Sequence, residues 1–496
     1  MATKQLPAAS REFLQIVSQA SFINPFSDEY AVQQRRIANC DASISDEEQV
    51  RLMVARWNDH LHALTASGVT NLKQVAGDDR ELLRYAFLYE IYHRFLVSFD
   101  ELITDQMAAG DRRVVVSFAS KALAIFSRRG FEAAEARRYF AIFYQIRRAY
   151  YFIDRGLIGR SPCMRQLRLH LWNNVFTHNI RSYERHMWNR MEDFSTMLLG
   201  ETGTGKGAAA AAIGRSGFIP FDEKRDCFAE SFTRGFVSLN LSQFPETLIE
   251  SELFGHKKGA FTGAVEEHEG VFARCSPHGA ILLDEIGDAT IPVQIKLLQV
   301  LQERTFSPVG SHERQRFRGR VIAATNRPLD QLRATGQFRD DFYYRLCSDV
   351  ITVPTLRQRI TEDSRELDDL VTHLVLRLTG ETSSEAVSMV QAALDTGLGR
   401  NYPWPGNVRE LEQAVRRILL TRQYTGDLKA VAPDLRSQLI AGVEHGTLDA
   451  DAVLSGYCQL LYERHGTYEE VARRTKLDRR TVKAYLEKRA AVAGRS

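Results

Sequence analysis

The chain has 496 residues, of which 44% are hydrophobic and 26% are charged, and its formal net charge is +3. This length exceeds what one hydrophobic core usually supports, so about three domains are expected. Six scattered cysteines without a CxxC pair argue against a disulfide framework or zinc site, and no window reaches the ~18 apolar residues of a membrane span, so we expect a cytoplasmic protein without membrane contact.

The first 155 residues read as helical. Apolar residues recur at three- and four-residue spacing in residues 82–99 and 135–153, and both stretches are rich in tyrosine and phenylalanine. Such aromatic stripes are more often core packing than a ligand cage. No strand leads into paired acids, as it would in a phosphoacceptor receiver domain. We therefore expect residues 1–155 to form an all-α N-terminal regulatory domain of unknown input, or a helical docking module.

A glycine-rich segment, GETGTGKG, matches the GxxxxGK pattern of phosphate-binding loops. Its glycines let successive backbone amides face one phosphate chain, the following helix adds its positive end, and the lysine can reach the outer phosphates. The expected nucleotide-binding residues are Gly200, Glu201, Thr202, Gly203, Thr204, Gly205, Lys206 and Gly207. Gly207 stands where most such loops place Ser or Thr, and it weakens the start of the helix by ~1 kcal/mol.

Short apolar segments follow in alternation with helical ones: MLLG, GFVSLNL, AILLDE and RVIAATN. This alternation predicts an α/β fold with a doubly wound parallel sheet that binds ligands at the carboxyl ends of its strands. From about Pro354 the pattern is all-helical and suggests a small lid. Asp284 and Glu285 end one strand at the height of the phosphates, where Asp284 can hold magnesium and Glu285 can orient and deprotonate the attacking water.

A glycine-flanked apolar segment interrupts this alternation between the phosphate loop and the acidic pair. It consists of Gly259, Ala260, Phe261, Thr262, Gly263 and Ala264. We expect Phe261 and Thr262 to protrude, and an exposed phenylalanine in a loop favours a partner surface over a role in the fold.

The end of the chain is basic, with ten Lys or Arg against five Asp or Glu in residues 463–496. Residues 467–489 predict two short helices with a tight joint at Leu477 and Asp478, and Asp478 can cap the second helix. The side chains expected to contact DNA are Arg479, Arg480, Thr481 and Lys483. The alternative is a solvated helix face without a nucleic-acid role.

The order of these motifs, with GAFTGA between the phosphate loop and ILLDEIGD, resembles the bacterial activators of sigma-54 RNA polymerase, and the resemblance runs from about residue 156 to the C-terminus. It implies an AAA+ P-loop ATPase over residues 156–355, a helical lid and linker over 356–445, and a small Fis-type helix-turn-helix domain over 446–496. Relative to this family, residues 172–195 and 214–235 are long, and we expect surface insertions there.

The resemblance also assigns roles to single residues. Asn326 would sense the terminal phosphate, Asn240 would restrain Glu285, and Arg409 would touch nucleotide in its own subunit. Arg339 and Arg345 would act in trans on the nucleotide of a neighbouring subunit, which requires a ring.

The implied function is activation of transcription. Dimers would bind upstream enhancer DNA and assemble into a hexamer, and ATP hydrolysis with Mg²⁺ would drive the GAFTGA loop against sigma-54 RNA polymerase. Two alternatives are another AAA+ remodelling ATPase, such as a helicase or chelatase subunit, and a DNA-binding repressor with a vestigial ATPase. The first leaves GAFTGA unexplained, and the second predicts decay of catalytic residues that are all present.

Overall fold

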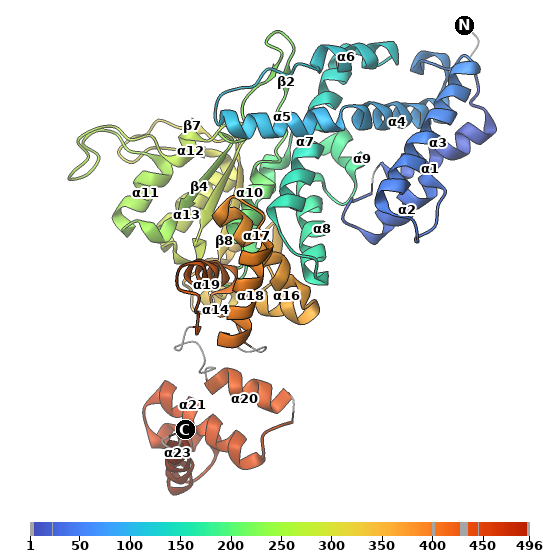
Figure 1. Ribbon diagram of the computed structural model, residues 1–496. Coiled ribbons are helices and arrows are strands. Elements are labelled where there is room, and N and C mark those ends of the chain that lie inside the picture. Colours follow the sequence, from blue (N-terminus) through green and yellow to red (C-terminus); the bar gives the residue numbers. More distant parts are fainter. Residues whose placement is uncertain (1–3, 22, 399–401, 427–434, 445, 494–496) are drawn as a thin grey trace. The chain divides into compact units, whose positions relative to one another are not determined.

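The computed structural model describes residues 4–21, 23–398, 402–426, 435–444 and 446–493 (Figure 1). The N-terminal region is all-helical, as expected. Its helices are α1 (Ala8–Ala20), α2 (Asp28–Ala38), α3 (Asp46–Ala66), η1 (Leu72–Gln74), α4 (Gly77–Arg94), α5 (Leu96–Ala109), α6 (Ala119–Arg128) and α7 (Ala133–Gly156). Over the described parts of the chain, no helix is both long enough and apolar enough to cross a membrane.

The predicted doubly wound sheet is present and has five strands, all parallel, in the order β4-β5-β8-β1-β9. Their bounds are β1 (Thr196–Leu199), β4 (Phe236–Asn240), β5 (Ala280–Asp284), β8 (Arg320–Thr325) and β9 (Asp349–Thr352). The sequence patterns had not indicated β9, which lies at one edge. Two small antiparallel hairpins stand apart from the sheet: β2 (Phe221–Asp222) with β3 (Cys227–Phe228), and β6 (Thr305–Phe306) with β7 (Gln315–Arg316).

Helices cover both faces of the sheet. They are α8 (Pro162–Phe176), α9 (Ile180–Ser182), η2 (Tyr183–Met187), η3 (Met191–Asp193), α10 (Lys206–Gly214), η4 (Leu241–Gln243), α11 (Glu246–Phe254), α12 (Val271–Arg274), η5 (Ile286–Asp288), α13 (Ile291–Glu303), α14 (Leu329–Ala334) and α15 (Asp340–Leu346). Neighbouring residues of a strand point to opposite faces. Thus Leu282 joins the core under α8 and α10, whereas Ile281 and Leu283 join the core under α11, α13 and α15.

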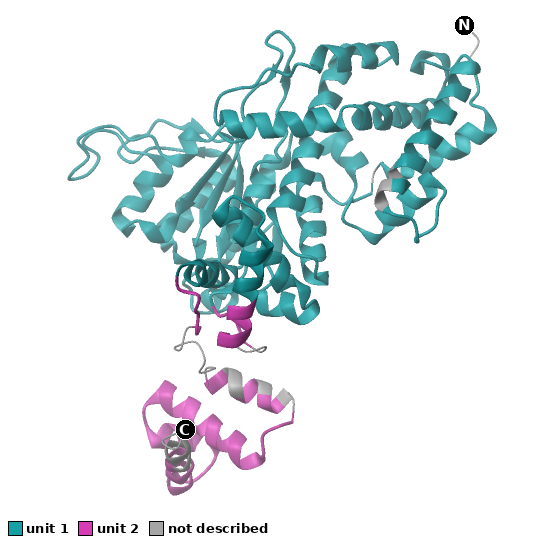
Figure 2. Cartoon of the chain, viewed as in Figure 1, with its two compact units in different colours: residues 1–391, 406–420 teal, residues 392–405, 421–496 magenta. Residues whose placement is uncertain are grey.

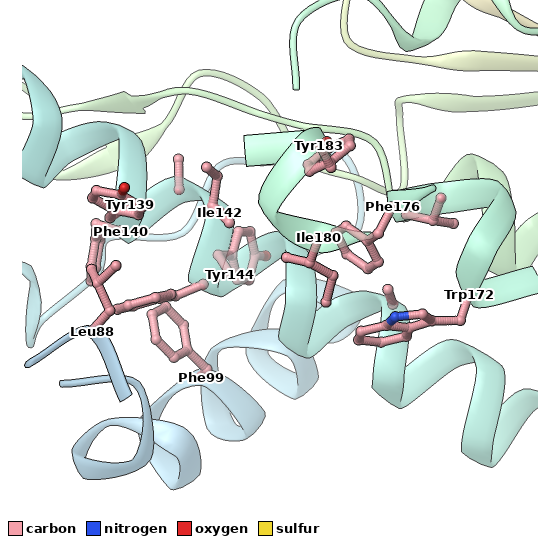
Figure 3. Close-up of a cluster of buried hydrophobic side chains, with 14 of the residues drawn as sticks. Leu88, Phe99, Tyr139, Phe140, Ile142, Tyr144, Trp172, Phe176, Ile180 and Tyr183 are labelled. Atoms are coloured by element: carbon pink, nitrogen blue, oxygen red, sulfur yellow. The ribbon is translucent and has the colours of Figure 1, made fainter. Parts of the chain in front are cut away.

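The N-terminal helices share the first of these two cores. One continuous set of buried side chains runs from the N-terminal helices through α7, α8 and α10 to the sheet. Figure 3 shows part of it, with Phe99, Tyr144 and Phe176 among the aromatic side chains. A boundary near residue 156 therefore does not separate two hydrophobic cores.

The two stretches that we expected to be surface insertions are not on the surface, and that expectation was wrong. From residues 172–195, Trp172 and Tyr183 are buried in the shared core. In residues 214–235, the β2–β3 hairpin lays Phe228 flat on Tyr144 of α7, with ring centroids 4.1 Å apart. Phe221 meets Phe140 of the same helix edge-on at 5.0 Å. Both stretches join the N-terminal helices to the sheet, which explains their length.

The chain divides into two compact units (Figure 2). One comprises residues 1–391 and 406–420, and the other comprises residues 392–405 and 421–496. The helices after the sheet are α16 (Leu356–Glu362), α17 (Arg365–Thr379), α18 (Ser384–Leu398) and α19 (Asn407–Thr421), and then α20 (Leu435–Glu444), α21 (Ala450–His465), α22 (Tyr468–Thr475) and α23 (Arg479–Ala493).

A buried ion pair fixes the segment between α7 and α8. Arg359 of α16 donates to Glu366 of α17 at 2.9 Å, and both side chains are almost fully buried. Arg359 also donates to the Ile158 carbonyl at 2.5 Å, and Glu366 accepts from the Ser161 amide at 2.7 Å. A Cβ on Gly159, whose φ is +137°, would lie 2.6 Å from the Arg359 guanidinium. This position therefore requires glycine.

Replacing Phe228 with alanine tests whether the β2–β3 hairpin is structural. The variant loses a buried ring that packs on α7, so we expect unfolding free energy to fall by about 3–5 kcal/mol in chemical denaturation. Lys224→Ala, in the same hairpin at an exposed position, is the matched control and should change stability by less than ~0.5 kcal/mol. If both substitutions lower the free energy of unfolding by the same small amount, the hairpin is a surface element and not part of the core.

The Arg359–Glu366 pair predicts a particular dependence of stability on pH. Burial opposes the charge on Glu366, but hydrogen bonds from Ser161 and the Arg359 guanidinium outweigh it, so the pKa lies below the ordinary 4.5. The stabilisation is then complete above that ordinary value and is lost as pH falls through the lower pKa of the folded state. Glu366→Gln should have a lower free energy of unfolding than the wild type at neutral pH. Between about pH 6 and about pH 3.5, its free energy of unfolding, measured by urea titration, should fall by less than that of the wild type. Parallel losses in both proteins would contradict this account.

Candidate functional site

The glycine-rich loop connects the end of β1 to the start of α10. Gly203 and Gly205 have φ values of +80° and +104°, which favour glycine. At Gly203 a Cβ would lie 2.2 Å from the Gly406 carbonyl oxygen, so the lid approaches the loop closely there. At Gly207 a Cβ would meet nothing within 4 Å. The glycine that departs from the usual pattern is therefore not sterically required.

Lys206 is buried and folds back on its own loop. Its Nζ donates to the carbonyl oxygens of Gly200 at 2.8 Å and Glu201 at 3.1 Å. Burial lowers the pKa of Lys206, and Asp284 and Glu285 act in the opposite direction. The ammonium group is thus held among acceptors at the mouth of the loop, where an anion with more negative charge can replace the carbonyls.

Asp284 and Glu285 lie at the carboxyl end of β5, beside this lysine. Asp284 Oδ1 accepts from the Glu285 amide at 3.0 Å. Glu285 has a φ of +54°, which is unusual for a residue other than glycine. Its Oε2 is buried and has no hydrogen-bond partner among the described residues. A strained backbone that presents an unsatisfied carboxylate oxygen is typical of a functional position.

The neighbouring strand ends add two asparagines. Asn326, directly after β8, donates from Nδ2 to Thr202 Oγ1 at 2.8 Å, and so ties β8 to the phosphate loop. Asn240 ends β4 in register with Asp284, and its side chain accepts from the Ser242 amide at 2.9 Å. The carboxyl ends of these parallel strands meet at one edge of the sheet, as the alternation of strands and helices indicated.

The lid contributes a residue that the sequence reasoning missed. Asn407 is fully buried at a φ of +53°. Its Nδ2 donates to Glu201 Oε2 at 3.0 Å and to the Thr202 carbonyl at 3.1 Å, and its Oδ1 accepts from the Leu356 amide at 2.8 Å. Asn407 lies in the YPWPGNVREL segment two residues before Arg409, and an Asn after Pro-Gly is a signal for such a turn.

These groups surround a cleft of ≈ 380 Å³. Of the expected site residues, it is lined by Thr202, Gly203, Thr204, Gly205, Lys206, Gly207, Asp284, Glu285 and Arg409. Its other wall is apolar, with Leu157, Ile158, Leu370 and Leu374. A polar end at the phosphate loop and an apolar end beside the segment after α7 suit a phosphorylated ligand with a flat ring. Gly156, Leu157 and Ile158 were not among the expected site residues.

Six of the residues expected at the nucleotide site do not line this cleft: Gly200, Glu201, Asn240, Asn326, Arg339 and Arg345. Arg339 lies at the start of α15 and pairs with Asp341 at 2.7 Å. Arg345, the residue before the last of α15, donates to the Leu301 carbonyl at 2.7 and 3.0 Å. The two arginines of one chain are therefore not part of that chain's own nucleotide cleft.

The GAFTGA segment is a closed loop beside the β6–β7 hairpin, and Figure 1 shows the loops on this side of α11 extending from the sheet. The Gly259 amide donates to the Ala264 carbonyl at 2.8 Å, and Gly259 and Gly263 have φ values of +79° and +102°. Thr262 is exposed, as expected. Phe261 is instead half-buried and packs edge-on against His256 at 4.9 Å. The expectation that its ring protrudes was wrong because the neck of the loop shelters it.

The neck of this loop is built by its flanking residues. His256 exchanges two backbone hydrogen bonds of 3.0 Å with His268, and Lys257 pairs with Glu267 at 2.6 Å. The Lys257 amide also donates to the Val309 carbonyl at 3.1 Å, so the loop is joined to the segment between β6 and β7.

The last three helices form a small unit around Cys458, Val471 and Val482. Asp478 caps α23 as expected: its Oδ1 accepts from the amides of Arg480 at 2.9 Å and Thr481 at 3.0 Å. The expected DNA-contacting side chains are Arg479, Arg480 and Lys483, which are exposed, and Thr481, which is half-buried. The side chains of Lys488, Arg489 and Arg495, which add to the basic end, lie outside the described residues.

The residues of the cleft fit ATP and a magnesium ion. The unsatisfied Glu285 oxygen, the carboxylate of Asp284 and the buried Lys206 are the donor set that a triphosphate with an oxygen-coordinated cation requires. An Asp284 carboxylate at a strand end provides the hard oxygen ligand that magnesium prefers.

Comparison with known proteins agrees with this geometry. Residues 175–352 match the family model of the sigma-54 interaction domain, and residues 361–444 match that of the AAA+ ATPase lid domain. The transcriptional regulatory protein ZraR of Salmonella typhimurium is 34% identical over 340 residues, which are 67% of this chain and 68% of that protein. The Nif-specific regulatory protein of Azotobacter vinelandii is 38% identical over 270 residues, which are 54% of this chain and 45% of that protein.

The chain thus spans less than half the length of that Nif-specific regulator. A solved structure of NtrX from Brucella abortus in complex with ATP is 20% identical, covers 75% of this chain and 80% of its own, and superposes with a TM-score of 0.40. The ZraR match extends over two thirds of both proteins. The chain therefore belongs to the family of sigma-54-dependent transcriptional activators with an AAA+ ATPase domain.

Proposed function

We propose that this protein hydrolyses ATP and uses the energy to activate transcription by sigma-54 RNA polymerase. The observation that carries the proposal is the Glu285 carboxylate oxygen, which is buried without a partner next to Lys206 and opposite the phosphate loop. Burying an unsatisfied carboxylate is costly, so its position favours a catalytic role over a structural one.

Each of several residues in the cleft has a separate role in ATP hydrolysis. Lys206 binds the outer phosphates when its two carbonyl contacts are exchanged for phosphate oxygens. Glu285 orients a water molecule and accepts its proton, and Asn326 holds the edge of the site through Thr202. Asp284 would hold the magnesium ion, which neutralises charge on the phosphates. Asn240 would restrain Glu285, and its register with Asp284, the residue before Glu285, supports this role.

A ring of subunits completes the site. Arg339 and Arg345 do not line their own chain's cleft but lie on α15, and a guanidinium supplied from a neighbouring subunit is worth about 10³–10⁵ in rate in phosphoryl transfer. Arg339 is bound only by an exposed acid two residues away, a contact worth little in water. It can exchange this contact for a phosphate. We propose a hexamer that assembles from dimers, in keeping with the family.

The GAFTGA loop is the proposed contact with sigma-54. Its two positive-φ glycines and the Gly259–Ala264 hydrogen bond give it a defined shape without a hydrophobic core of its own. Thr262 is exposed at the tip, and Phe261 can leave its contact with His256 when the loop changes conformation. Movement of an apolar ring from a sheltered to an open position suits a contact that is made only in one nucleotide state.

The C-terminal helices are the proposed reader of upstream enhancer DNA. The second helix of the pair presents Arg480 and Lys483 on its exposed side, while Val482 and Leu486 hold it in the small core. Basic side chains on one exposed helix face suit phosphates and base edges in a major groove.

Glu285→Gln separates binding from hydrolysis. The amide keeps the shape of the side chain but cannot accept the proton of water, so ATPase turnover should fall by about 10²–10⁴-fold while ATP binding persists. Steady-state phosphate release and equilibrium binding of a fluorescent ATP analogue measure the two properties. Glu246→Gln, an exposed acid on α11, should leave both unchanged. Turnover by Glu285→Gln at the wild-type rate would rule out the assignment.

Thr262→Ala separates hydrolysis from output. The substitution removes an exposed hydroxyl far from the nucleotide cleft, so ATPase activity should stay within about twofold of wild type. Open-complex formation on a sigma-54 promoter, followed by permanganate reactivity of the melted strand, should be lost. Thr335→Ala, at an exposed threonine after α14, is the control. Normal promoter opening by Thr262→Ala would show that GAFTGA is not the output loop.

A further inference from the structure

A second cavity, separate from the nucleotide cleft, lies within the N-terminal helices. Its volume is ≈ 380 Å³, within the range of small-molecule sites. Its wall is drawn mainly from α4 and α7, with further residues from α1, α2, α5, α8, α9 and η2 and from Ser21, Ile23 and Pro25. The lining includes Leu88, Tyr89, Ile142, Tyr150, Trp172 and Ile180, and Figure 3 shows four of these side chains.

Two polar atoms on this wall lack partners. The indole Nε1 of Trp172 and the hydroxyl of Tyr89 are both buried, and neither has a hydrogen-bond partner among the described residues. Trp172 is only 3% exposed. A buried N–H without an acceptor costs about 1–3 kcal/mol. Both residues line the cavity, so a molecule within it with a hydrogen-bond acceptor would satisfy the indole.

The charged groups of the wall are already paired. Arg147 donates to both carboxylate oxygens of Asp100, at 2.5 and 2.6 Å. Glu184 accepts from the Tyr139 hydroxyl and has Arg138 at 3.8 Å. His93, an exposed residue that also lines the cavity, has its pKa lowered to about 4 by desolvation. The imidazole is therefore neutral at pH 7, and the wall offers no unbalanced charge to an ionic ligand.

The helix that lines the cavity also contacts the phosphate-loop helix. On α7, Ile142, Ile146 and Tyr150 face the cavity at helical spacing. Gln145 and Arg148 lie on the other side, and positions 146 and 148 are about 200° apart around the axis.

From that other side, the Gln145 Nε2 donates to the Ser216 carbonyl at 2.9 Å. Arg148 donates to the carbonyls of Arg215 at 2.6 Å and Gly217 at 2.7 Å. These carbonyls directly follow α10, whose first residue is Lys206.

The segment formed by α9 and η2 also contacts both the cavity and the residues that bond to the end of α10. Ile180 and Glu184 line the cavity, and the hydroxyl of Tyr183 between them donates to Gln145 Oε1 at 2.8 Å. A molecule that fills the cavity therefore contacts both α7 and the α9–η2 segment. These two segments meet at Gln145, which is hydrogen-bonded to the Ser216 carbonyl after α10.

We propose that this cavity binds an uncharged, ring-containing small molecule with a hydrogen-bond acceptor, and that its occupancy controls ATP hydrolysis through α7 and α10. Apolar and aromatic walls favour the ring, the paired charges disfavour an ion, and Trp172 supplies the donor that orients the acceptor. The control of hydrolysis rests on the proposed ATPase function, whereas the binding of the molecule does not.

Binding is tested on the full chain with prodan, a neutral naphthalene ketone whose fluorescence reports an apolar environment. We expect saturable binding of one probe per chain. Ile142→Trp fills the cavity and should abolish it, while Ile295→Trp, at an exposed position of α13, should not. Trp172→Phe keeps the aromatic wall and removes the donor, so affinity should fall by about five- to tenfold. No saturable binding, or equal binding by Ile142→Trp, would overturn the proposal.

Charge preference is tested by competition between prodan and two ligands of the same shape. The neutral 2-naphthamide should displace the probe, and the anionic 2-naphthoate should compete at least about tenfold more weakly. Equal competition would show that the paired charges do not select a neutral ligand and would overturn that part of the proposal.

Coupling is tested by phosphate release with and without saturating prodan. We expect turnover of the wild type to change by about twofold or more. Gln145→Met leaves the cavity wall intact and should bind prodan with unchanged affinity, but its turnover should no longer respond. Binding without any change in wild-type turnover would overturn the control by the cavity. Absence of turnover under all conditions would instead contradict the proposed ATPase, and the binding result would still stand.

Discussion

The carbonyl groups that follow the phosphate-loop helix accept hydrogen bonds from a fully buried arginine, and the position of the N-terminal helices on the nucleotide-binding sheet depends on that contact. Burial lowers the pKa of Arg148 to about 10, so the guanidinium stays charged at neutral pH. The rings of Tyr144 and Phe232 lie 4.5 and 5.7 Å from it. A cation at the C-terminal end of a helix is favoured by the helix dipole, and more so where water is excluded.

This contact makes the N-terminal region part of the ATPase core rather than an appended module. An appended module would meet the sheet across a polar interface and could rotate as a body. Here α7 packs on α10, and the β2–β3 hairpin adds Phe221 and Phe228 to the same core. A shift in the position of the N-terminal helices therefore also displaces the end of α10, the helix that begins with Lys206. Close-packed cores respond to such changes by shifting between discrete arrangements rather than by yielding gradually.

Much of this architecture could be predicted from the sequence because its signals are local. The phosphate loop, the buried strands that precede Asp284 and Asn326, and the cap at Asp478 each depend on a few neighbouring residues. Partners that are far apart in the chain could not be predicted. The aromatic residues in residues 214–235 read as an insertion because their partners on α7 lie about eighty residues earlier. Tyr89 resembled a core residue and Trp172 fell in an expected surface insertion, since only the fold reveals that both border an open space.

Polar contacts connect the residues that follow β8 with the segment that precedes α11. Arg327, next to Asn326, donates to Asp288 Oδ1 at 2.9 Å, and Asp288 Oδ2 accepts from Ser242 at the same distance. Ser242 precedes α11, which ends at the neck of the GAFTGA loop. Contacts of this kind transmit a change only if their members have two arrangements. One such contact is that of Asn326 with Thr202 Oγ1: a bound phosphate that drew Asn326 away from Thr202 would allow β8 to move against Asp288 and to carry α11 with it.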